Sequence, residues 1–505
     1  MDYVVEMKEI NMSFGNVHAV NDGEFTLERG EIHSLIGENG AGKSTLMKIL
    51  NGIHRMDSGS IVINGEHFRH YNTKKAIQMG FGMVHQEFAL VDELTVLENI
   101  ILGFEPAKHG VIDFAKAREQ INFYIREYGF DVNLDKRILD ISVGEAQRVE
   151  ILKTLYRGAE IIILDEPTAV LTPQETLNLF EILRQLKSKG VSIVFISHKL
   201  NEVMEISDRI TIMRDGKYIT TVKKDEITIP ELANKMVGRD VTLACEKPPV
   251  HTGECVMSVQ NVYVSSKREL SKIKNVSFDL FQGEILGIAG VDGNGQNELV
   301  EAIMGLREVE QGSILIKGQP MQNQSVLDIR NTGVAYIPDD RNTRGLNKKF
   351  SIMENLIANH LGKIPFSKYG ILNKKNADDY SKDLVEKYDV RPRDPSLNVG
   401  NLSGGNAQKV VFAREIEADF DIFIAAQPTR GVDIGSIENI HKLINEIKLQ
   451  GKSVLLVSAE LEEIFALSDR IMVMYEGEIA GIVRAEDAEI NRIGLLMTGG
   501  GTSAS

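Results

Sequence analysis

The sequence predicts two homologous α/β domains in tandem, each built on a largely parallel sheet. Two motifs of the first half recur in the second half. Gly30-Glu31-Ile32 returns as Gly283-Glu284-Ile285. The glycine pattern Gly37-x-x-Gly40-x-Gly42 returns at the same spacing as Gly290-x-x-Gly293-x-Gly295. Each half opens with an apolar strand, a glycine loop and a helix. Further apolar strands then alternate with amphipathic helices, which is the pattern of a parallel sheet covered by helices.

The repeat also predicts the domain boundaries. The chain has 505 residues, enough for two such halves. We expect a first domain over 1–242, a linker over 243–254 where Pro248-Pro249 interrupts any periodic pattern, a second domain over 255–498, and a small, polar, flexible tail over 499–505.

Composition excludes several classes of protein. Apolar residues make up 43% and charged residues 26% of the chain, as in soluble globular proteins. No apolar run reaches the ~18 residues of a membrane span, and no signal peptide is evident, so we expect a cytosolic protein. Cys245 and Cys255 have no metal-ligand spacing and receive no role. The net charge of −15 argues against binding to nucleic acid.

The elements of the first half follow in order along the chain. Glu31–Ile36 is an apolar strand that leads into the glycine loop, and a helix runs from Ser44 to Leu50. Ile161–Leu164 and Ser192–Ile196 are apolar strands. Between them, Thr172-Pro173-Gln174-Glu175 is a capping box with proline at the first helical position. The helix behind it has one apolar face, which we interpret as core: Leu179, Ile182, Leu183 and Leu186.

The glycine loop predicts a phosphate site. Gly37-Glu38-Asn39-Gly40-Ala41-Gly42-Lys43-Ser44 fits the P-loop pattern in the required context, after a strand and before a helix. Its backbone N–H groups can point at phosphate oxygens, and the helix N-terminus adds its positive end. We expect Lys43 to reach the β- and γ-phosphates and the Ser44 hydroxyl to ligate Mg²⁺. The alternative is a simple glycine turn.

Two strand ends carry candidate catalytic groups. Asp165 and Glu166 follow an apolar strand, so that Asp165 can hold Mg²⁺ and Glu166 can polarise an attacking water. His198 follows another apolar strand and can hydrogen-bond a γ-phosphate. A strand end of this kind and a lone histidine also have purely structural interpretations, which the presence of the P-loop disfavours.

Together these residues resemble the ATP-binding cassette of ABC transporters, twice along the chain. The resemblance implies two tandem P-loop NTPase domains of the ABC type, each with a helical subdomain. Leu402-Ser403-Gly404-Gly405-Asn406 is similar to the cassette signature, and Ile141-Ser142-Val143-Gly144-Glu145 is an altered form of it. Gln86 stands where the family has a Mg²⁺ ligand that also couples to the permease. Phe14 stands where an aromatic stacks on adenine, with a core phenylalanine as the alternative.

The resemblance assigns roles to individual residues. Catalysis is assigned to Glu166, His198 and Lys43. Mg²⁺ is assigned to Ser44, Gln86 and Asp165. The residues implied to bind ATP are Phe14, Gly37, Glu38, Asn39, Gly40, Ala41, Gly42, Lys43, Ser44, Thr45, Ser403, Gly404, Gly405 and Asp433. In this family the two cassettes pair head to tail, so that each nucleotide lies between the P-loop of one half and the signature of the other.

The two halves differ in their chemical groups. In the second half, Lys43, Ser44 and Thr45 are replaced by Gln296, Asn297 and Glu298. The other replacements there are Ala426 for Asp165, Gln427 for Glu166, Ala459 for His198 and Asp339 for Gln86. These losses all fall on one composite site, the one formed by the P-loop of the second half and the altered signature of the first half. We therefore expect one hydrolytic and one degenerate site. At the second site a γ-phosphate would find no lysine, and Glu298 and Asp339 would add negative charge near it.

The resemblance is closest to the ATPase subunits of ribose-type sugar importers. Leu155-Tyr156-Arg157-Gly158 and the segment 424–431 favour their nucleoside-importing branch, with a simple sugar such as ribose or galactose as the alternative. Such a chain is peripheral at the cytoplasmic face of the membrane. Its partners are two permease subunits and, indirectly, an extracytoplasmic solute-binding protein, and no nucleic acid is expected. A soluble tandem cassette acting in translation and a non-enzymatic nucleotide-gated scaffold are more remote alternatives.

Overall fold

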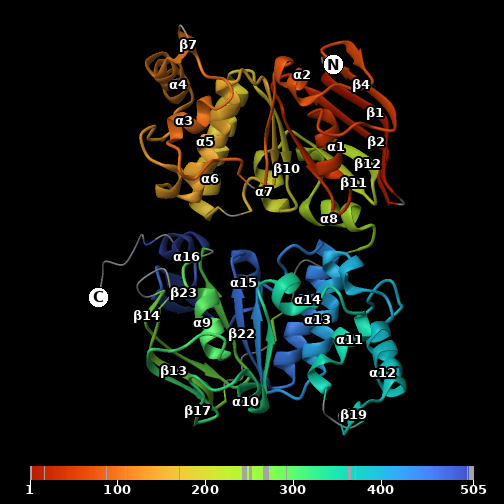
Figure 1. Ribbon diagram of the computed structural model, residues 1–505, viewed down its shortest axis with the longest axis vertical. Helices are drawn as coiled ribbons and strands as arrows, with labels where there is room; N and C mark the ends of the chain where they lie inside the picture. The colour runs from red at the N-terminus through yellow and green to blue at the C-terminus, as the bar shows by residue number, and fades with distance from the viewer. Residues whose placement is uncertain are drawn as a thin grey trace. The chain divides into compact units, whose positions relative to one another are not determined.

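The computed structural model divides into two compact units, Met1–Val241 and Thr242–Ser505. It describes residues 3–15, 17–86, 88–108, 110–169, 171–240, 247–248, 253–265, 272–291, 293–361, 365–369, 371–497 and 499. Most of the predicted linker 243–254 therefore lies outside the described residues, and so does the predicted tail 499–505 apart from Gly499. Figure 1 shows that each unit combines sheets with surrounding helices.

The first unit contains two main sheets. The antiparallel sheet has the order β2-β1-β4-β5, and the six-stranded sheet has the order β12-β11-β3-β10-β9-β6. In the larger sheet β6, β9, β10, β3 and β11 pair in parallel, and β12 adds an antiparallel edge. The strands are β1 (Tyr3–Phe14), β2 (Val17–Glu28), β3 (Ile32–Ile36), β4 (Ser58–Ile63), β5 (Glu66–Phe68), β6 (Phe81–Val84), β9 (Ile161–Asp165), β10 (Ser192–Ile196), β11 (Arg209–Arg214) and β12 (Lys217–Lys223), with a short pair β7 (Ala107–Lys108) and β8 (Val111–Ile112).

Helices of the first unit fall into two groups. The helices α3, α4 and α5 contact one another and form the helical subdomain. Of the others, α6 and α7 connect strands of the larger sheet, α8 follows it, and α1 and α2 each lie between a strand of one sheet and a strand of the other. The helices are α1 (Lys43–Leu50), α2 (Thr73–Gln78), α3 (Val96–Ile101), α4 (Phe114–Tyr128), α5 (Val143–Tyr156), α6 (Pro173–Ser188), α7 (Leu200–Ile206) and α8 (Ile229–Val237).

The second unit repeats this topology strand for strand. Its sheets have the orders β14-β13-β16-β17 and β18-β21-β22-β15-β23-β24. The strands are β13 (Cys255–Val264), β14 (Ile273–Phe281), β15 (Ile285–Ala289), β16 (Gln311–Ile316), β17 (Gln319–Pro320), β18 (Val334–Ile337), β19 (Ser367–Lys368), β20 (Ile371–Leu372), β21 (Ile422–Ala426), β22 (Ser453–Ser458), β23 (Arg470–Tyr475) and β24 (Glu478–Arg484). The helices are α9 (Gln296–Ile303), α10 (Val326–Asn331), α11 (Ile352–Leu356), α12 (Lys374–Lys387), α13 (Gly404–Ile416), α14 (Ile434–Leu449), α15 (Leu461–Leu467) and α16 (Ile490–Met497).

The predicted α/β fold with a helical subdomain in each half is confirmed. The strand predicted over Glu31–Ile36 is β3, the one over Ser192–Ile196 is β10, and the predicted capping box begins α6, with Thr172 as N-cap and Glu175 bonding back to it. The apolar face of α6 is core, since Leu183 and Leu186 are fully buried.

The larger sheet of the first unit is buried on both faces, which explains its unbroken apolar strands. In β9 the side chains of Ile162 and Leu164 join the core formed with α3 to α6. Those of Ile161 and Ile163 join the core formed with α1 and the antiparallel sheet. A strand that is covered on both faces needs apolar residues at every position rather than at every second one.

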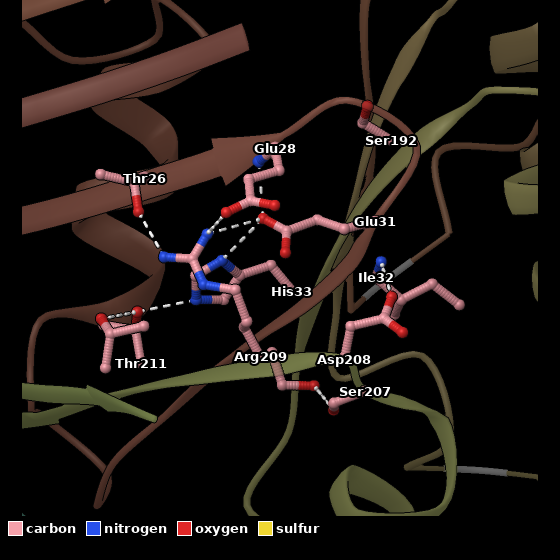
Figure 2. A network of polar contacts seen from close by, with 12 residues as sticks. Thr26, Glu28, Glu31, Ile32, His33, Ser192, Ser207, Asp208, Arg209 and Thr211 are labelled. Atoms are coloured by element: carbon pink, nitrogen blue, oxygen red, sulfur yellow. Dashed lines mark hydrogen bonds and ion pairs between the residues drawn. The ribbon is translucent and has the colours of Figure 1, made fainter. Parts of the chain in front are cut away.

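A polar network anchors the first residues of β3, the strand that leads to the P-loop (Figure 2). The His33 ring is fully buried between the Glu31 carboxylate, 3.2 Å from Nδ1, and the Thr211 hydroxyl, 2.7 Å from Nε2. The Arg209 guanidinium pairs with Glu31 and Glu28, and the Asp208 carboxylate accepts from the backbone N–H of Ile32. These contacts fix the position and direction of β3 beneath the loop.

Candidate functional site

Four segments with predicted roles leave the same edge of the larger sheet. The P-loop follows β3, Glu166 follows β9, His198 follows β10 and Gln86 follows β6. The four strands lie in one parallel array, so their carboxyl ends meet at one edge. Ligand sites of open α/β sheets form outside the carboxyl ends of the strands. The topology therefore gathers residues that are far apart in the sequence.

The P-loop folds around its own lysine. Lys43 Nζ donates hydrogen bonds to the backbone oxygens of Gly37 at 2.8 Å and Glu38 at 3.0 Å. Burial lowers the pKa of Lys43, and the neighbouring Glu166 and Asp165 carboxylates oppose that shift. The ammonium is thus held at the inner side of the loop, in a position to exchange carbonyl partners for phosphate oxygens.

Gly42 is required by its backbone. Its φ is 90°, which an L-residue rarely adopts, and a Cβ there would lie 2.4 Å from the backbone oxygen of Ala19. Gly42 is the N-cap of α1, so Lys43, Ser44 and Thr45 form the first turn of that helix. Glu38, Asn39, Gly40 and Ala41 complete the loop between β3 and α1.

Two of the predicted metal ligands meet in the structure. Ser44 Oγ donates a hydrogen bond of 3.1 Å to Asp165 Oδ1. Burial raises the pKa of Asp165, with the Ser44 hydrogen bond opposing it. A hydroxyl and a buried carboxylate side by side are the hard oxygen donors that Mg²⁺ prefers, so these residues fit the ion.

The carboxylate of Glu166 lies between two donors. His198 Nδ1 is 3.1 Å from Oε1, and Gln86 Nε2 donates to Oε2 at 3.1 Å. The predicted metal ligand Gln86 thus directs its amide at Glu166. The hydrogen bond from His198 lowers the pKa of Glu166 although burial opposes it, so the side chain is ionised at neutral pH. Glu166 also adopts a left-handed backbone with φ of 49°, a conformation concentrated at functional sites.

Phe14 stands at the exposed end of β1. Its side chain is 48% exposed, which rules out the alternative of a core phenylalanine. The ring packs edge-on against His54, with 5.4 Å between ring centroids. His54 was not predicted as a site residue, since it lies in the turn after α1 and is brought to Phe14 by the fold.

The intact signature is the N-terminus of α13 in the second unit. Ser403 is the N-cap, and its hydroxyl accepts from Asn406 Nδ2 at 2.9 Å. A Cβ on Gly404 would lie 2.7 Å from the Gly431 backbone oxygen, and one on Gly405 would lie 2.5 Å from the Asp433 carboxylate. Close packing against the backbone before α14 therefore requires glycine at 404, whereas a Cβ at 405 would meet the ends of side chains. Asp433 caps α14 by accepting from the backbone N–H of Ser436.

The corresponding loop of the second unit is tied up by its own side chains. Gln296 Nε2 donates to the Val291 oxygen at 3.1 Å, and Asn297 Nδ2 donates to Asp339 Oδ2 at 2.9 Å. Gln427 has the same φ of 49° as Glu166, and its amide oxygen accepts from the backbone N–H of Ala459. The backbone geometry is conserved between the units while the ionisable groups are not.

Two cations in the second unit change the charge expected there. Glu298 Oε1 lies 3.7 Å from Lys272 Nζ, and Asp339 Oδ1 lies 3.9 Å from Arg344 Nη1. The negative charge of these two acidic residues is therefore partly compensated, which their sequence positions alone did not reveal. The missing lysine, carboxylates and histidine remain the main difference.

Comparisons with known proteins agree with this geometry. The ABC transporter family matches residues 20–169 and 273–430. The chain is 44% identical to the nucleoside import ATP-binding protein NupA of Lactococcus lactis subsp. cremoris, over 98% of each chain. It is 45% identical to the guanosine import ATP-binding protein NupO of Bacillus subtilis, over 99% of this chain and 98% of that one. It is 39% identical to the ribose import ATP-binding protein RbsA of Bacillus subtilis, over 98% and 99%.

A solved structure shares the tandem fold. The crystal structure of archaeal ribosome recycling factor aABCE1 in complex with ribosomal stalk protein aP1 has a TM-score of 0.61 and 19% identity, over 93% of this chain and 89% of that one. At this identity the likeness concerns the fold alone.

This chain belongs to the ABC transporter family. It is an ATP-binding protein and an ATPase of that family, as the two matched cassette regions and its full-length relatives indicate. Among the helices of the described residues, none is both long and apolar enough to span a membrane.

Proposed function

We propose that this chain hydrolyses ATP at its first P-loop and thereby drives the import of a nucleoside through membrane permease subunits. The observation that carries the site assignment is the asymmetry between the units. The first unit gathers Lys43, Ser44, Asp165, Glu166 and His198 at one sheet edge, whereas the second has uncharged side chains at all five places.

Each residue of the first unit has a distinct proposed role. Lys43 and the loop N–H groups bind the β- and γ-phosphates, and His198 bonds the γ-phosphate. Glu166 accepts a hydrogen bond from the attacking water and orients it for in-line attack, a task that suits an ionised, partly buried carboxylate. Catalysis of phosphoryl transfer is largely positioning and electrostatic stabilisation, so small displacements of these groups reduce turnover.

Ser44 and Asp165 would hold Mg²⁺, with Gln86 as a third candidate once its amide turns from Glu166. Bound there, the ion would neutralise part of the triphosphate charge. Head-to-tail pairing, as the family resemblance implies, would bring Ser403, Gly404, Gly405 and Asp433 to the same nucleotide, and Phe14 would stack on its base.

The proposed substrate class rests on the relatives. The nucleoside and guanosine import proteins are 44% and 45% identical to this chain, whereas the ribose import protein is 39% identical. The proposed partners are two permease subunits and, indirectly, an extracytoplasmic solute-binding protein. The solute contacts those partners, and this chain supplies the ATPase cycle at the cytoplasmic face of the membrane.

Reconstitution tests the proposal. The full chain, its permease subunits and its binding protein are placed in vesicles, and phosphate release is measured with guanosine, adenosine, ribose or galactose outside. We expect a nucleoside to stimulate hydrolysis and to be taken up, and the Glu166→Gln complex to show neither response. Stimulation by a sugar and by no nucleoside would overturn the substrate class. Full turnover in the Glu166→Gln complex would overturn the site.

A further inference from the structure

Glu202 ties together the two loops that carry the proposed catalytic groups. Its Oε2 accepts a hydrogen bond of 2.5 Å from Thr168 Oγ1, two residues after Glu166. The same oxygen accepts from Ser197 Oγ at 3.4 Å, one residue before His198. Both hydroxyl residues are 2% exposed, so these bonds are shielded from water.

The contacts form a closed ring. One path runs along the chain from Glu166 to Thr168 and through its hydroxyl to Glu202. The other runs from Glu202 through Ser197 to His198, whose Nδ1 is 3.1 Å from Glu166 Oε1. The ring therefore links Glu202 to two groups that it does not itself touch.

The ring depends on a carboxylate at position 202. An ionised carboxylate is an acceptor at both oxygens, and one oxygen can take two hydroxyl donors. Lys199 Nζ lies 3.6 Å from the other oxygen, Oε1, and favours the ionised form. Glu202 is in the first turn of α7, where its charge also interacts favourably with the helix dipole. A purely helix-stabilising role is therefore the competing explanation, and the experiment must separate the two.

Among the described residues of the second unit, no such bridge is formed. The counterpart of Glu202 is Glu463, which directs Oε1 at the His441 ring of α14, 3.1 Å away. Within the described residues, Glu463 Oε2 is buried without a hydrogen-bond partner. The second unit has Gln427 and Ala459 in place of Glu166 and His198. In that unit Glu463 contacts a different residue.

We infer that Glu202 is a positioning residue for ATP hydrolysis, acting through Thr168 and Ser197 to set the Glu166–His198 contact. The inference rests on the proposed function, because it assumes that Glu166 and His198 act on the nucleotide. Glu202 is not expected to contact ATP. We therefore expect Glu202 to govern the rate of the chemical step rather than nucleotide binding.

The test uses the purified full chain and steady-state phosphate release. We expect Glu202→Gln and Thr168→Val each to lower kcat about tenfold or more, since small displacements of reacting groups cost up to about 10²-fold. The KM for ATP should stay within about twofold, because the P-loop is untouched. Thr168→Ser retains the hydroxyl and should keep kcat within about threefold of the wild type.

Glu463→Gln and Thr429→Val are the matched controls, since they change the same positions of the second unit and should leave kcat unchanged. Thermal unfolding of every variant separates a folding defect from a kinetic one. If Glu202→Gln does not fold, the comparison of Thr168→Val with Thr168→Ser carries the test.

Unchanged kcat in a folded Glu202→Gln or Thr168→Val chain would overturn the inference, and so would equal losses in the Glu463→Gln and Thr429→Val controls. In the same assay, Glu166→Gln must abolish turnover, and its failure to do so would overturn the proposed function instead.

Discussion

Replacing Glu166 by glutamine removes one charge from the proposed site and changes little else. The two side chains have nearly the same shape, and the second unit already holds Gln427 at the same φ of 49°. The amide oxygen of a glutamine can still accept from His198. We therefore expect the Glu166→Gln chain to fold, with a stability loss on the order of 1 kcal/mol from weaker hydrogen bonding.

The kinetic effect should be much larger than the effect on stability. The ionised carboxylate of Glu166 lies 3.1 Å from both His198 Nδ1 and Gln86 Nε2. A glutamine in its place would be unable to accept a proton from water. General-base catalysis contributes about 10²–10⁴-fold to a rate, which is ~3–5 kcal/mol of activation free energy. Lys43 is unchanged, so ATP affinity should be retained.

The assay is phosphate release at saturating ATP, paired with titration of a fluorescent ATP analogue. The mirror variant Gln427→Glu serves as the comparison, because its surroundings lack the lysine, aspartate and histidine of the first unit. We expect Glu166→Gln to lose at least about 99% of turnover while it still binds nucleotide, and Gln427→Glu to behave as the wild type. The opposite outcome, with turnover lost in Gln427→Glu and kept in Glu166→Gln, would refute the assignment of the hydrolytic site to the first unit.

Three further predictions concern binding and stability. Lys43→Gln, which copies Gln296, should weaken ATP binding by about 1.5–3 kcal/mol through loss of charge-assisted bonds, and unchanged affinity in a nucleotide titration would contradict the phosphate role of Lys43. Burial lowers the pKa of His33 below its ordinary value of 6.5, so the unfolded chain takes up a proton that the folded chain excludes, and stability falls as the pH falls below that value. Chemical denaturation from about pH 6.5 to 5 should therefore show a larger loss of stability in the wild type than in His33→Leu, and equal losses would contradict the lowered pKa of His33. Leu183→Ala should cost about 2–5 kcal/mol, measured in the same way, because Leu183 is fully buried in the core under α6, and a loss below about 1 kcal/mol would contradict that packing.

Much of the fold could be predicted because it is encoded locally. The strand Ser192–Ile196 was predicted with its observed bounds, since an apolar run buried on both faces has a simple pattern. The capping box at Thr172 was found for the same reason, because its side chains bond within one turn. A similar box at Ser142 and Glu145 was read only as an altered signature, although Glu145 bonds back to its N-cap in α5.

The partners of long polar side chains were harder to predict. Glu298 and Asp339 are predicted to add negative charge, but their sequence positions do not show that Lys272 and Arg344 lie beside them. Gln86 is predicted to bind Mg²⁺, and its sequence position gave no sign of the hydrogen bond that its amide also donates to Glu166. Glu202 received no role, because nothing in its local sequence indicates that Thr168 lies 2.5 Å away.

The sequence by itself determined which groups each half contains: a lysine, an aspartate, a glutamate and a histidine in the first, and uncharged replacements in the second. The tertiary structure decided which of those groups touch. Strand order sets this, because β3, β10, β9 and β6 come from distant parts of the chain and bring their carboxyl ends to one edge. Hydrogen bonds reach about 3 Å, so the pairing of His198 with Glu166 and of Glu202 with Thr168 exists only once that edge has formed.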